Sequence, residues 1–223
     1  MVKQNAGPQN GTPVPPDQLH VTLTSLAKGD VLHRVHLSRY RADQFNAGLH
    51  GNARFSPIQN EHGDPIPTLY GGTTLECALM ETVFHDVPHT AGFKSFDKDK
   101  LLEQLHSMLQ IRQVLQLADL ASVPLRKLGV TRKQLIDTEK DQYPFTRKWA
   151  ALIYRQCPQV QGLSWVSRQD DSARAFMLFG DRIDEGVLLP DGDPRSLLED
   201  GVTYDAVLDL AERIGVLIVS GRN

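Results

Sequence analysis

The sequence predicts a mixed α+β fold in which mainly antiparallel sheets are flanked by helices. Strand-like and helix-like stretches follow one another irregularly, without the regular alternation of a doubly wound sheet. Residues 31–36 alternate apolar and polar positions as a strand does, whereas residues 145–156 have a helical pattern with prolines near both ends. Residues 162–167 and 175–179 resemble neighbouring strands separated by a polar turn.

Length and composition indicate one core. The chain has 223 residues, 40% of them hydrophobic, which is enough to bury one sizeable core. We therefore expect a single domain over residues 21–223, with a helical insertion around residues 98–142. Residues 1–20 are rich in Gln, Asn, Gly and Pro and have no apolar run, so this segment is expected to be a disordered tail rather than a signal peptide.

Charge and cysteine content exclude several classes of protein. The 24 basic and 27 acidic residues are spread along the chain, so no basic stripe predicts a nucleic-acid partner. No apolar run approaches the roughly 20 residues that span a bilayer. The two cysteines, Cys77 and Cys157, form no spacing motif, which favours a reducing, cytoplasmic setting.

The first strands lead into a helix. The strand at residues 31–36 carries Arg34 and His36 on one face. Residues 65–70 predict a turn into a short strand, and the Gly71-Gly72 pair predicts a tight turn into a helix over residues 74–85.

That helix contains an unusual carboxylate. Thr73 and Glu76 fit a capping box at its start, and the remaining positions are apolar nearly all round, so the helix should be buried. Glu81 is then the one ionisable group of the helix body besides the terminal His85. A buried carboxylate costs roughly several kcal/mol unless it is paired. Glu81 is thus a candidate functional residue, although a solvated face or a structural ion pair would also explain it.

The second half of the chain gives a mixed pattern. Residues 112–119 predict a strand, and short helices are expected around Leu125 and Gln134, with Thr131 as an N-cap. Residues 187–189 form a third short apolar run after the two strands above. The chain should close with a helix over residues 204–214, with Gly215 as its C-cap.

Common catalytic motifs are absent from the sequence. It contains no G-x-G-x-x-G, no P-loop, no H-E-x-x-H and no G-x-S-x-G. The eight histidines do not follow the spacing of a metal site, so no metal is expected.

Five residues in order point to a known family. Arg34, Arg54, Tyr70, Glu81 and Ser167 stand in the segments HRV, RFSP, TLYGGTTLECALMETVFHD and GLSWVSR, with YPFTRKWAALIY before the last of these. With these segments the chain resembles the RES-domain family, named for its Arg, Glu and Ser, from about Val31 to Val219. The family includes bacterial toxins that consume NAD and pair with an Xre-type antitoxin. Its fold is similar to that of the ADP-ribosyltransferase toxins.

Two departures from the family pattern stand out. The glycine that usually precedes the second arginine is Ala53 here, and the chain is longer than a compact toxin.

The resemblance implies an enzyme that uses NAD as its substrate, with no further cofactor. Cleavage of the bond between nicotinamide and ribose passes through an oxocarbenium-like state that a carboxylate stabilises, a role suited to Glu81. Arg34 and Arg54 are candidates for the pyrophosphate, since guanidinium groups bind phosphates by charge-assisted hydrogen bonds. Tyr70 would pack on nicotinamide or ribose and Ser167 would hydrogen-bond ribose or phosphate. The catalytic set is therefore Glu81, Arg34 and Tyr70, with Arg54 and Ser167 binding substrate.

Each residue also has a structural explanation when taken alone. The arginines could form surface ion pairs, Tyr70 could lie at a core edge, and Ser167 could terminate a strand. The acceptor of the ADP-ribosyl group stays open between water, inorganic phosphate and a protein side chain. The last choice would make the chain a protein ADP-ribosyltransferase. A non-catalytic nucleotide-binding module is a further alternative, with Ala53 as its support.

Overall fold

The computed structural model describes residues 11–88 and 90–221 and has the expected α+β architecture. Within these residues, nine strands form one sheet in the order β1-β6-β7-β8-β3-β2-β5-β10, with β9 also paired to β5. All neighbouring pairs of this sheet are antiparallel except β6 and β7. The strands are β1 (Leu23–Leu26), β2 (Val31–Leu37), β3 (Thr68–Gly72), β5 (Gln104–Ile111), β6 (Leu115–Asp119), β7 (Gly162–Val166), β8 (Arg174–Phe179), β9 (Leu188–Pro190) and β10 (Arg195–Ser196).

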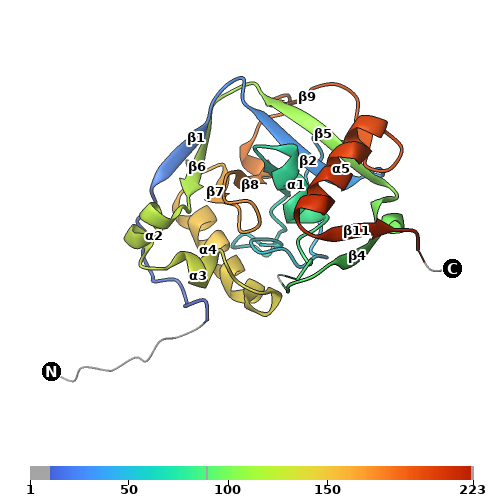
Figure 1. The fold of residues 1–223 in the computed structure, drawn as a ribbon. Helices are drawn as coiled ribbons and strands as arrows, with labels where there is room; N and C mark the ends of the chain where they lie inside the picture. Colours follow the sequence, from blue (N-terminus) through green and yellow to red (C-terminus); the bar gives the residue numbers. More distant parts are fainter. Residues whose placement is uncertain (1–10, 89, 222–223) are drawn as a thin grey trace.

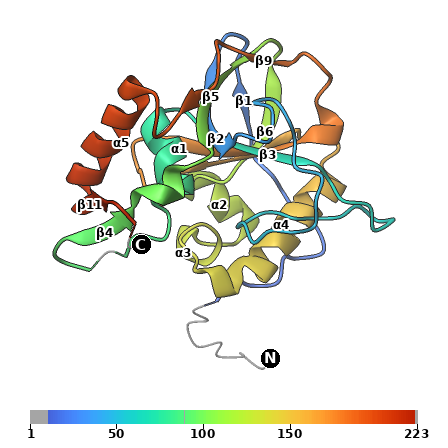
Figure 2. The same ribbon diagram turned by 90° about the vertical axis from the view of Figure 1, so that its right-hand side faces the viewer.

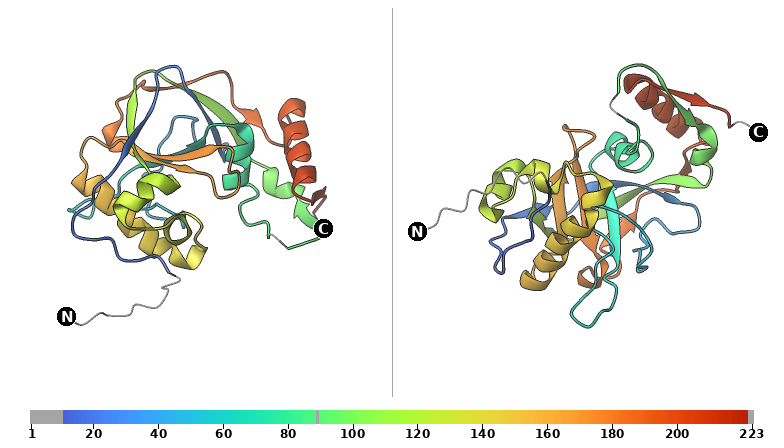
Figure 3. Two further views of the ribbon diagram at one scale, coloured as in Figure 1. Left: turned by 60° about the vertical axis from the view of Figure 1, so that its left-hand side comes forward. Right: turned by 90° about the horizontal axis from the view of Figure 1, so that it is seen from below.

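The helices form two groups around the sheet. Figure 2 shows α2 (Ser122–Leu128), α3 (Arg132–Leu135) and α4 (Tyr143–Gln156) together below the sheet. The other group consists of α1 (Leu75–Thr82) and α5 (Gly201–Arg213). A small parallel ribbon of β4 (Lys94–Asp97) and β11 (Val216–Val219) lies beside them (Figure 1). This ribbon and α5 lie at one end of the molecule, away from α2–α4 (Figure 3). The described residues also contain three single-turn 3-10 helices, η1 (Lys98–Leu101), η2 (Lys140–Gln142) and η3 (Gly180–Arg182).

Separate apolar clusters hold each group of helices on the sheet. Phe55, Trp149 and Trp165 belong to the cluster between the sheet and α2–α4, and all three are almost fully buried. A second cluster joins α1, α5 and β11 through residues such as Leu79 and Val207. The helix α1 is therefore buried on most of its surface, as its apolar sequence predicts. None of the described helices is long and apolar enough to cross a membrane.

The start of α1 differs from the sequence prediction. Its N-cap is Thr74, whose side chain accepts a hydrogen bond from the Cys77 amide, and not Thr73. The preceding glycine pair is not a turn, because Gly71 and Gly72 continue β3 and pair with β8. Gly72 is required by a close approach, since a Cβ there would lie 2.8 Å from Cys77 Sγ. The strand thus runs two residues beyond Tyr70, and the helix begins one residue later than predicted.

Other boundaries are also corrected. The helix α1 ends at Thr82, not at His85, and the last helix runs from Gly201 to Arg213. Ile214 is its C-cap and Gly215 follows with a left-handed φ of 69°. The chain does not close with that helix but continues into β11.

Residues 98–142 are not a purely helical insertion. Their first half supplies the paired strands β5 and β6 of the main sheet, and only residues 122–142 are mainly helical. The strand β5 was missed because its sequence, QLHSMLQI, mixes polar and apolar residues, while pairing on both sides buries it.

The predicted disordered tail is wrong for residues 11–20, whereas residues 1–10 lie outside the described part. Thr12 donates from its amide to Gln142 Oε1 at 3.1 Å and from its hydroxyl to Gln134 O at 2.6 Å. Trp149 Nε1 donates to Pro13 O at 2.8 Å. This segment is therefore packed in an extended form along α3 and α4.

Candidate active site

A cavity of about 720 Å³ lies between the two groups of helices. Its walls come from β2, the long segment between β2 and β3, β3 itself, α1 with the loop after it, η2 with the start of α4, and the end of β7. Arg34, Arg54, Tyr70 and Glu81 all line this cavity, although they are spread over 48 residues of sequence. The fifth predicted residue, Ser167, does not line the cavity and is fully buried behind it.

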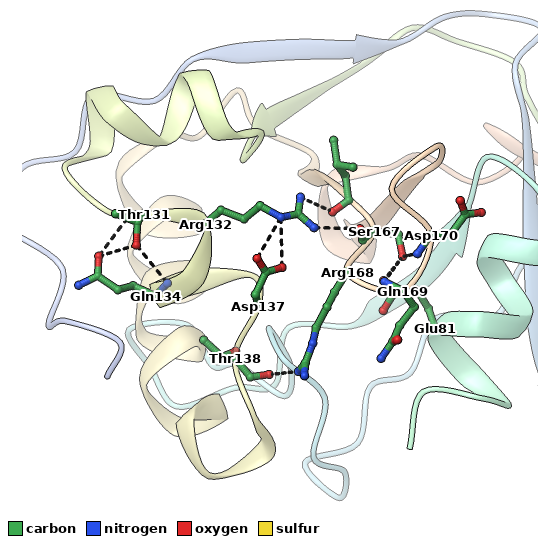
Figure 4. A network of polar contacts seen from close by, with 11 residues as sticks. Glu81, Thr131, Arg132, Gln134, Asp137, Thr138, Ser167, Arg168, Gln169 and Asp170 are labelled. Atoms are coloured by element: carbon green, nitrogen blue, oxygen red, sulfur yellow. Dashed lines mark hydrogen bonds and ion pairs between the residues drawn. The ribbon is translucent and has the colours of Figure 1, made fainter. Parts of the chain in front are cut away.

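Glu81 and Ser167 are directly bonded. Ser167 Oγ donates a hydrogen bond to Glu81 Oε1 at 2.6 Å and accepts hydrogen bonds from the amides of Gln169 and Asp170 at 3.0 and 3.1 Å (Figure 4). Because two amides already point at the Ser167 oxygen, its own proton is directed to Glu81. Glu81 is half-buried and forms no ion pair among the residues described. The structural ion pair considered for Glu81 is therefore not present there.

Arg54 offers hydrogen-bond donors without acceptors. The residue is only 8% exposed, and its Nε and Nη1 atoms are buried without a partner. Its guanidinium carbon lies 5.6 Å from the centre of the Tyr143 ring, and Thr146 of α4 donates a hydrogen bond to the Arg54 backbone oxygen. A buried guanidinium without an anion is costly, so this position suits an anionic ligand.

Arg34 is partly committed to the protein. Its Nη1 atom donates to Ala42 O and, at 2.9 Å, to Gln44 O, which holds the segment after β2 against the strand. Burial lowers the pKa of Arg34 to about 10, and the charge of Asp43 opposes this shift. The side chain is still a cation at neutral pH and adds positive charge to the cavity wall.

Tyr70 is a neutral phenol in this cavity. Its hydroxyl accepts a hydrogen bond from the Phe55 amide at 3.3 Å, and its ring meets Trp165 edge to face at 6.3 Å. Burial raises the pKa of Tyr70 to about 12. The phenol therefore stays protonated at neutral pH and does not act as a general base.

Several cavity residues escaped the sequence analysis. Tyr143 lies beneath Arg54, Trp165 contributes an indole N–H that is buried without a partner, and His36 faces the cavity from β2. The two aromatic residues stand within patterns that predict an ordinary helix and an ordinary strand, so no local signal marks them. His36 was noted only as lying on the face of Arg34.

Two ion pairs are formed between residues that line the cavity. Lys140 Nζ lies 2.7 Å from Asp86 Oδ2, and Arg168 pairs with Glu139. The first pair joins η2 to the loop after α1, and the second joins the residue before η2 to the loop after β7. In the described part of the chain, no cluster of three or more His, Cys, Asp or Glu side chains could hold a metal ion.

Comparison with protein families identifies the chain. The model of the RES domain matches residues 31–198, which include all five predicted site residues. The chain belongs to the RES family. The matched range ends before α5 and β11, earlier than the Val219 expected from the sequence.

A solved structure supports the same fold. This RES chain is similar to a chain in the crystal structure of the M. tuberculosis MbcT–MbcA toxin–antitoxin complex, with a TM-score of 0.57 and 13% sequence identity. The similarity covers 82% of this chain and 90% of that one. A search of the curated proteins finds no match.

Proposed function

We propose that this RES protein cleaves NAD between nicotinamide and ribose, with Glu81 as the carboxylate that stabilises the transition state. The observation that carries this proposal is the placement of Glu81, held by Ser167, in the same cavity as the unpaired guanidinium of Arg54. The cavity volume of about 720 Å³ is in the range of small-molecule sites.

The chemistry needs few groups. As the glycosidic bond breaks, positive charge develops on the ribose, and a fixed carboxylate beside it lowers the barrier. Nicotinamide leaves as a neutral base, so no second carboxylic acid is needed to protonate it. Glu81 therefore suffices as the catalytic carboxylate, and the Ser167 hydroxyl keeps it in one orientation. The other carboxylates that line the cavity, Asp86 and Glu139, are held in ion pairs.

The arginines are assigned to the dinucleotide's phosphates. Arg54 has buried donors to offer, and each hydrogen bond to a charged group contributes about 1.5–3 kcal/mol. Arg34 contributes its charge while its Nη1 atom stays on the two backbone carbonyls. Tyr70 supplies a flat, uncharged wall for nicotinamide or ribose.

Inorganic phosphate is the acceptor that we favour over water. Attack by water needs a general base. Three histidines line the cavity, His36, His50 and His85, and the Nε2 atom of His85 lies 3.2 Å from Asp86 Oδ1. Tyr70 has a pKa raised to about 12 by burial, and His36 has both ring nitrogens engaged, by Leu37 O at 3.0 Å and by Ser107 Oγ at 2.8 Å. Phosphate needs no deprotonation and would be attracted by Arg54 and Arg34. The product would be ADP-ribose 1″-phosphate together with nicotinamide.

One experiment separates the activities. Purified protein is incubated with NAD, with and without phosphate and with cell extract, and the products are identified by mass. Phosphate-dependent loss of NAD with ADP-ribose 1″-phosphate as product supports the proposal. ADP-ribose at the same rate in both buffers would make the protein a hydrolase, and label on a protein band would make it an ADP-ribosyltransferase. NAD that is bound but not consumed would indicate a non-catalytic nucleotide-binding module.

The family and the fold also support a proposal for the role in the cell. We propose a toxin that is restrained by an Xre-type antitoxin, supported by the similarity to a chain of a toxin–antitoxin complex. Induced expression in bacteria should deplete NAD and stop growth, while the Glu81→Gln form should be tolerated. Unchanged growth and NAD in a host without any candidate antitoxin would contradict the toxin role.

A further inference from the structure

The short helix α3 presents a single arginine to the back of the site. Thr131 and Gln134 form a capping box, since Thr131 Oγ1 accepts from the Gln134 amide at 3.3 Å and Gln134 Oε1 accepts from the Thr131 amide at 3.1 Å. This box fixes the first helical residue as Arg132. Figure 4 shows the Arg132 side chain reaching from α3 toward the end of β7.

Arg132 hydrogen-bonds to the backbone at Ser167 and at the residue before it. Its Nη1 donates to Val166 O at 3.0 Å and its Nη2 to Ser167 O at 2.9 Å. Its Nε atom is paired with the Asp137 carboxylate at 3.1 Å, so all three guanidinium nitrogens have partners. A planar guanidinium with fixed donors holds two consecutive carbonyls in one orientation, which a single-point donor does not.

The chain of hydrogen bonds from Arg132 continues through Ser167 to Glu81. The carbonyl of Ser167 is fixed by Arg132, and the hydroxyl of the same residue holds Glu81 at 2.6 Å. Arg132 does not line the cavity and so does not touch a ligand bound there. The hydrogen-bonded route from Arg132 to Glu81 runs through Ser167.

We propose that Arg132 is a positioning residue for the cleavage reaction, acting on Glu81 through Ser167, with Asp137 holding the guanidinium in place. This inference rests on the proposed function of Glu81. The helix α3, which does not line the cavity, would thereby fix the orientation of the Glu81 carboxylate. Placement of a catalytic group to within a fraction of an ångström affects the barrier more than the binding of substrate.

The test is the steady-state kinetics of NAD loss in Arg132→Gln. Removing these hydrogen bonds should lower kcat about 10-fold, the effect of weakening one hydrogen bond to a charged group, and leave KM for NAD unchanged, because the arginines of the cavity are intact. In a Ser167→Ala background, Arg132→Gln should lower kcat no further. Arg132→Lys should recover part of kcat, since an ammonium can still donate to one carbonyl. Asp137→Asn, which keeps Arg132, should give a smaller loss of kcat and serves if Arg132→Gln does not fold.

Arg182→Gln is the matched control. Arg182 also donates to backbone carbonyls, those of Tyr154, Cys157 and Val160, but it lies outside the cavity and has no contact with Ser167 or Glu81. This variant should lose thermal stability with kcat unchanged. An Arg132→Gln protein that behaves in the same way overturns the inference, as does an equal loss of kcat with and without Ser167.

Failure of the inference is distinguishable from failure of the proposed function. If a folded Glu81→Gln protein consumes NAD as fast as the unsubstituted one, the proposed function fails. If Glu81→Gln is inactive and Arg132→Gln is fully active, the function stands and Arg132 is merely structural.

Discussion

At each end of α4 an arginine lies against a tyrosine of the helix, but the arginine's donors are paired at one end and unpaired at the other. At the C-terminal end, Arg182 lies 3.8 Å from the centre of the Tyr154 ring. Its Nη1 donates to Cys157 O and Val160 O at 2.8 and 2.7 Å, and its Nη2 donates to Tyr154 O. At the N-terminal end, Arg54 lies over Tyr143, but its Nε and Nη1 atoms have no acceptor.

This difference is the one expected between a structural arginine and an arginine that binds an anion. Buried polar groups in folded proteins are nearly always paired, so an unpaired one needs an explanation. Arg182 closes the end of a helix, where carbonyls lack partners of their own. Arg54 faces a cavity with donors left over, which fits a site that is completed by an anion. Both arginines lie against a tyrosine ring of α4, at 3.8 Å for Arg182 and 5.6 Å for Arg54, so residue type does not distinguish them and the pairing of their donors does.

The largest effect is expected at Glu81, the carboxylate of the cavity that Arg54 also lines. Glu81→Gln should lower kcat for NAD loss by roughly 10²–10³ or more, because a neutral amide does not stabilise the developing charge. Thermal unfolding should change little, since the Ser167 hydroxyl can still donate to the amide oxygen. A folded Glu81→Gln protein with full activity would remove the carboxylate from the mechanism.

Replacing each of the two arginines by Gln in turn tests the comparison directly. Arg54→Gln should raise KM for NAD by about 10- to 100-fold without loss of stability, because the lost donors have no partner in the folded protein. Arg182→Gln should do the reverse. It should lower the free energy of unfolding by about 2–3 kcal/mol and leave KM unchanged, because the carbonyls of Tyr154 and Val160 lose the guanidinium as a donor. KM measurements and thermal melts of both variants check this, and equal behaviour of the two would contradict the distinction.

An anion should stabilise the protein only if Arg54 is present. ADP, which carries the same pyrophosphate as NAD, should raise the free energy of unfolding by about 1.4 kcal/mol at ten times its Kd. For a chain of this size the corresponding rise in Tm is about 3–5 °C. Differential scanning fluorimetry should show this rise in the unsubstituted protein and in Arg182→Gln, but not in Arg54→Gln. A rise of the same size in Arg54→Gln would move the phosphate site elsewhere.

The smallest effect is expected at a second internally paired region, the stacked imidazoles of His33 and His106. His33 Nδ1 lies 3.0 Å from His106 Nε2. Burial lowers the pKa of His106 to about 4, with further lowering by the charges of His33, Arg195 and His36. Between pH 6.5 and about 4, His106 is protonated in the unfolded chain but neutral in the folded protein. The free energy of unfolding therefore falls as pH falls through that window.

His106→Gln should flatten this part of the stability–pH curve and leave KM for NAD unchanged at neutral pH. Chemical denaturation at pH 7 and pH 5 measures the difference between the two proteins. A curve with the same slope in His106→Gln would assign the acid sensitivity to other groups.

The elements with strong local patterns follow from the sequence alone. Period-two alternation gives β2, the proline-entered apolar stripe gives α4, and Thr131 gives the start of α3, because these depend on neighbours within a few residues. The capping residue of α1 does not follow in the same way. Both threonines satisfy the local rule, and only the pairing of Thr73 with Arg174 in the next strand leaves Thr74 as the cap.

The candidate site divides along the same line. The isolation of Glu81 in an apolar helix is a local property and could be predicted, whereas its bond to Ser167 joins residues 86 positions apart. The unpaired donors of Arg54, the commitment of Arg34 to two carbonyls and the hydrogen bonds of Arg132 depend on which acceptors the tertiary fold brings near. A sequence names the donors and acceptors that a chain possesses. Only packing decides which of them are paired within the protein and which remain for a ligand.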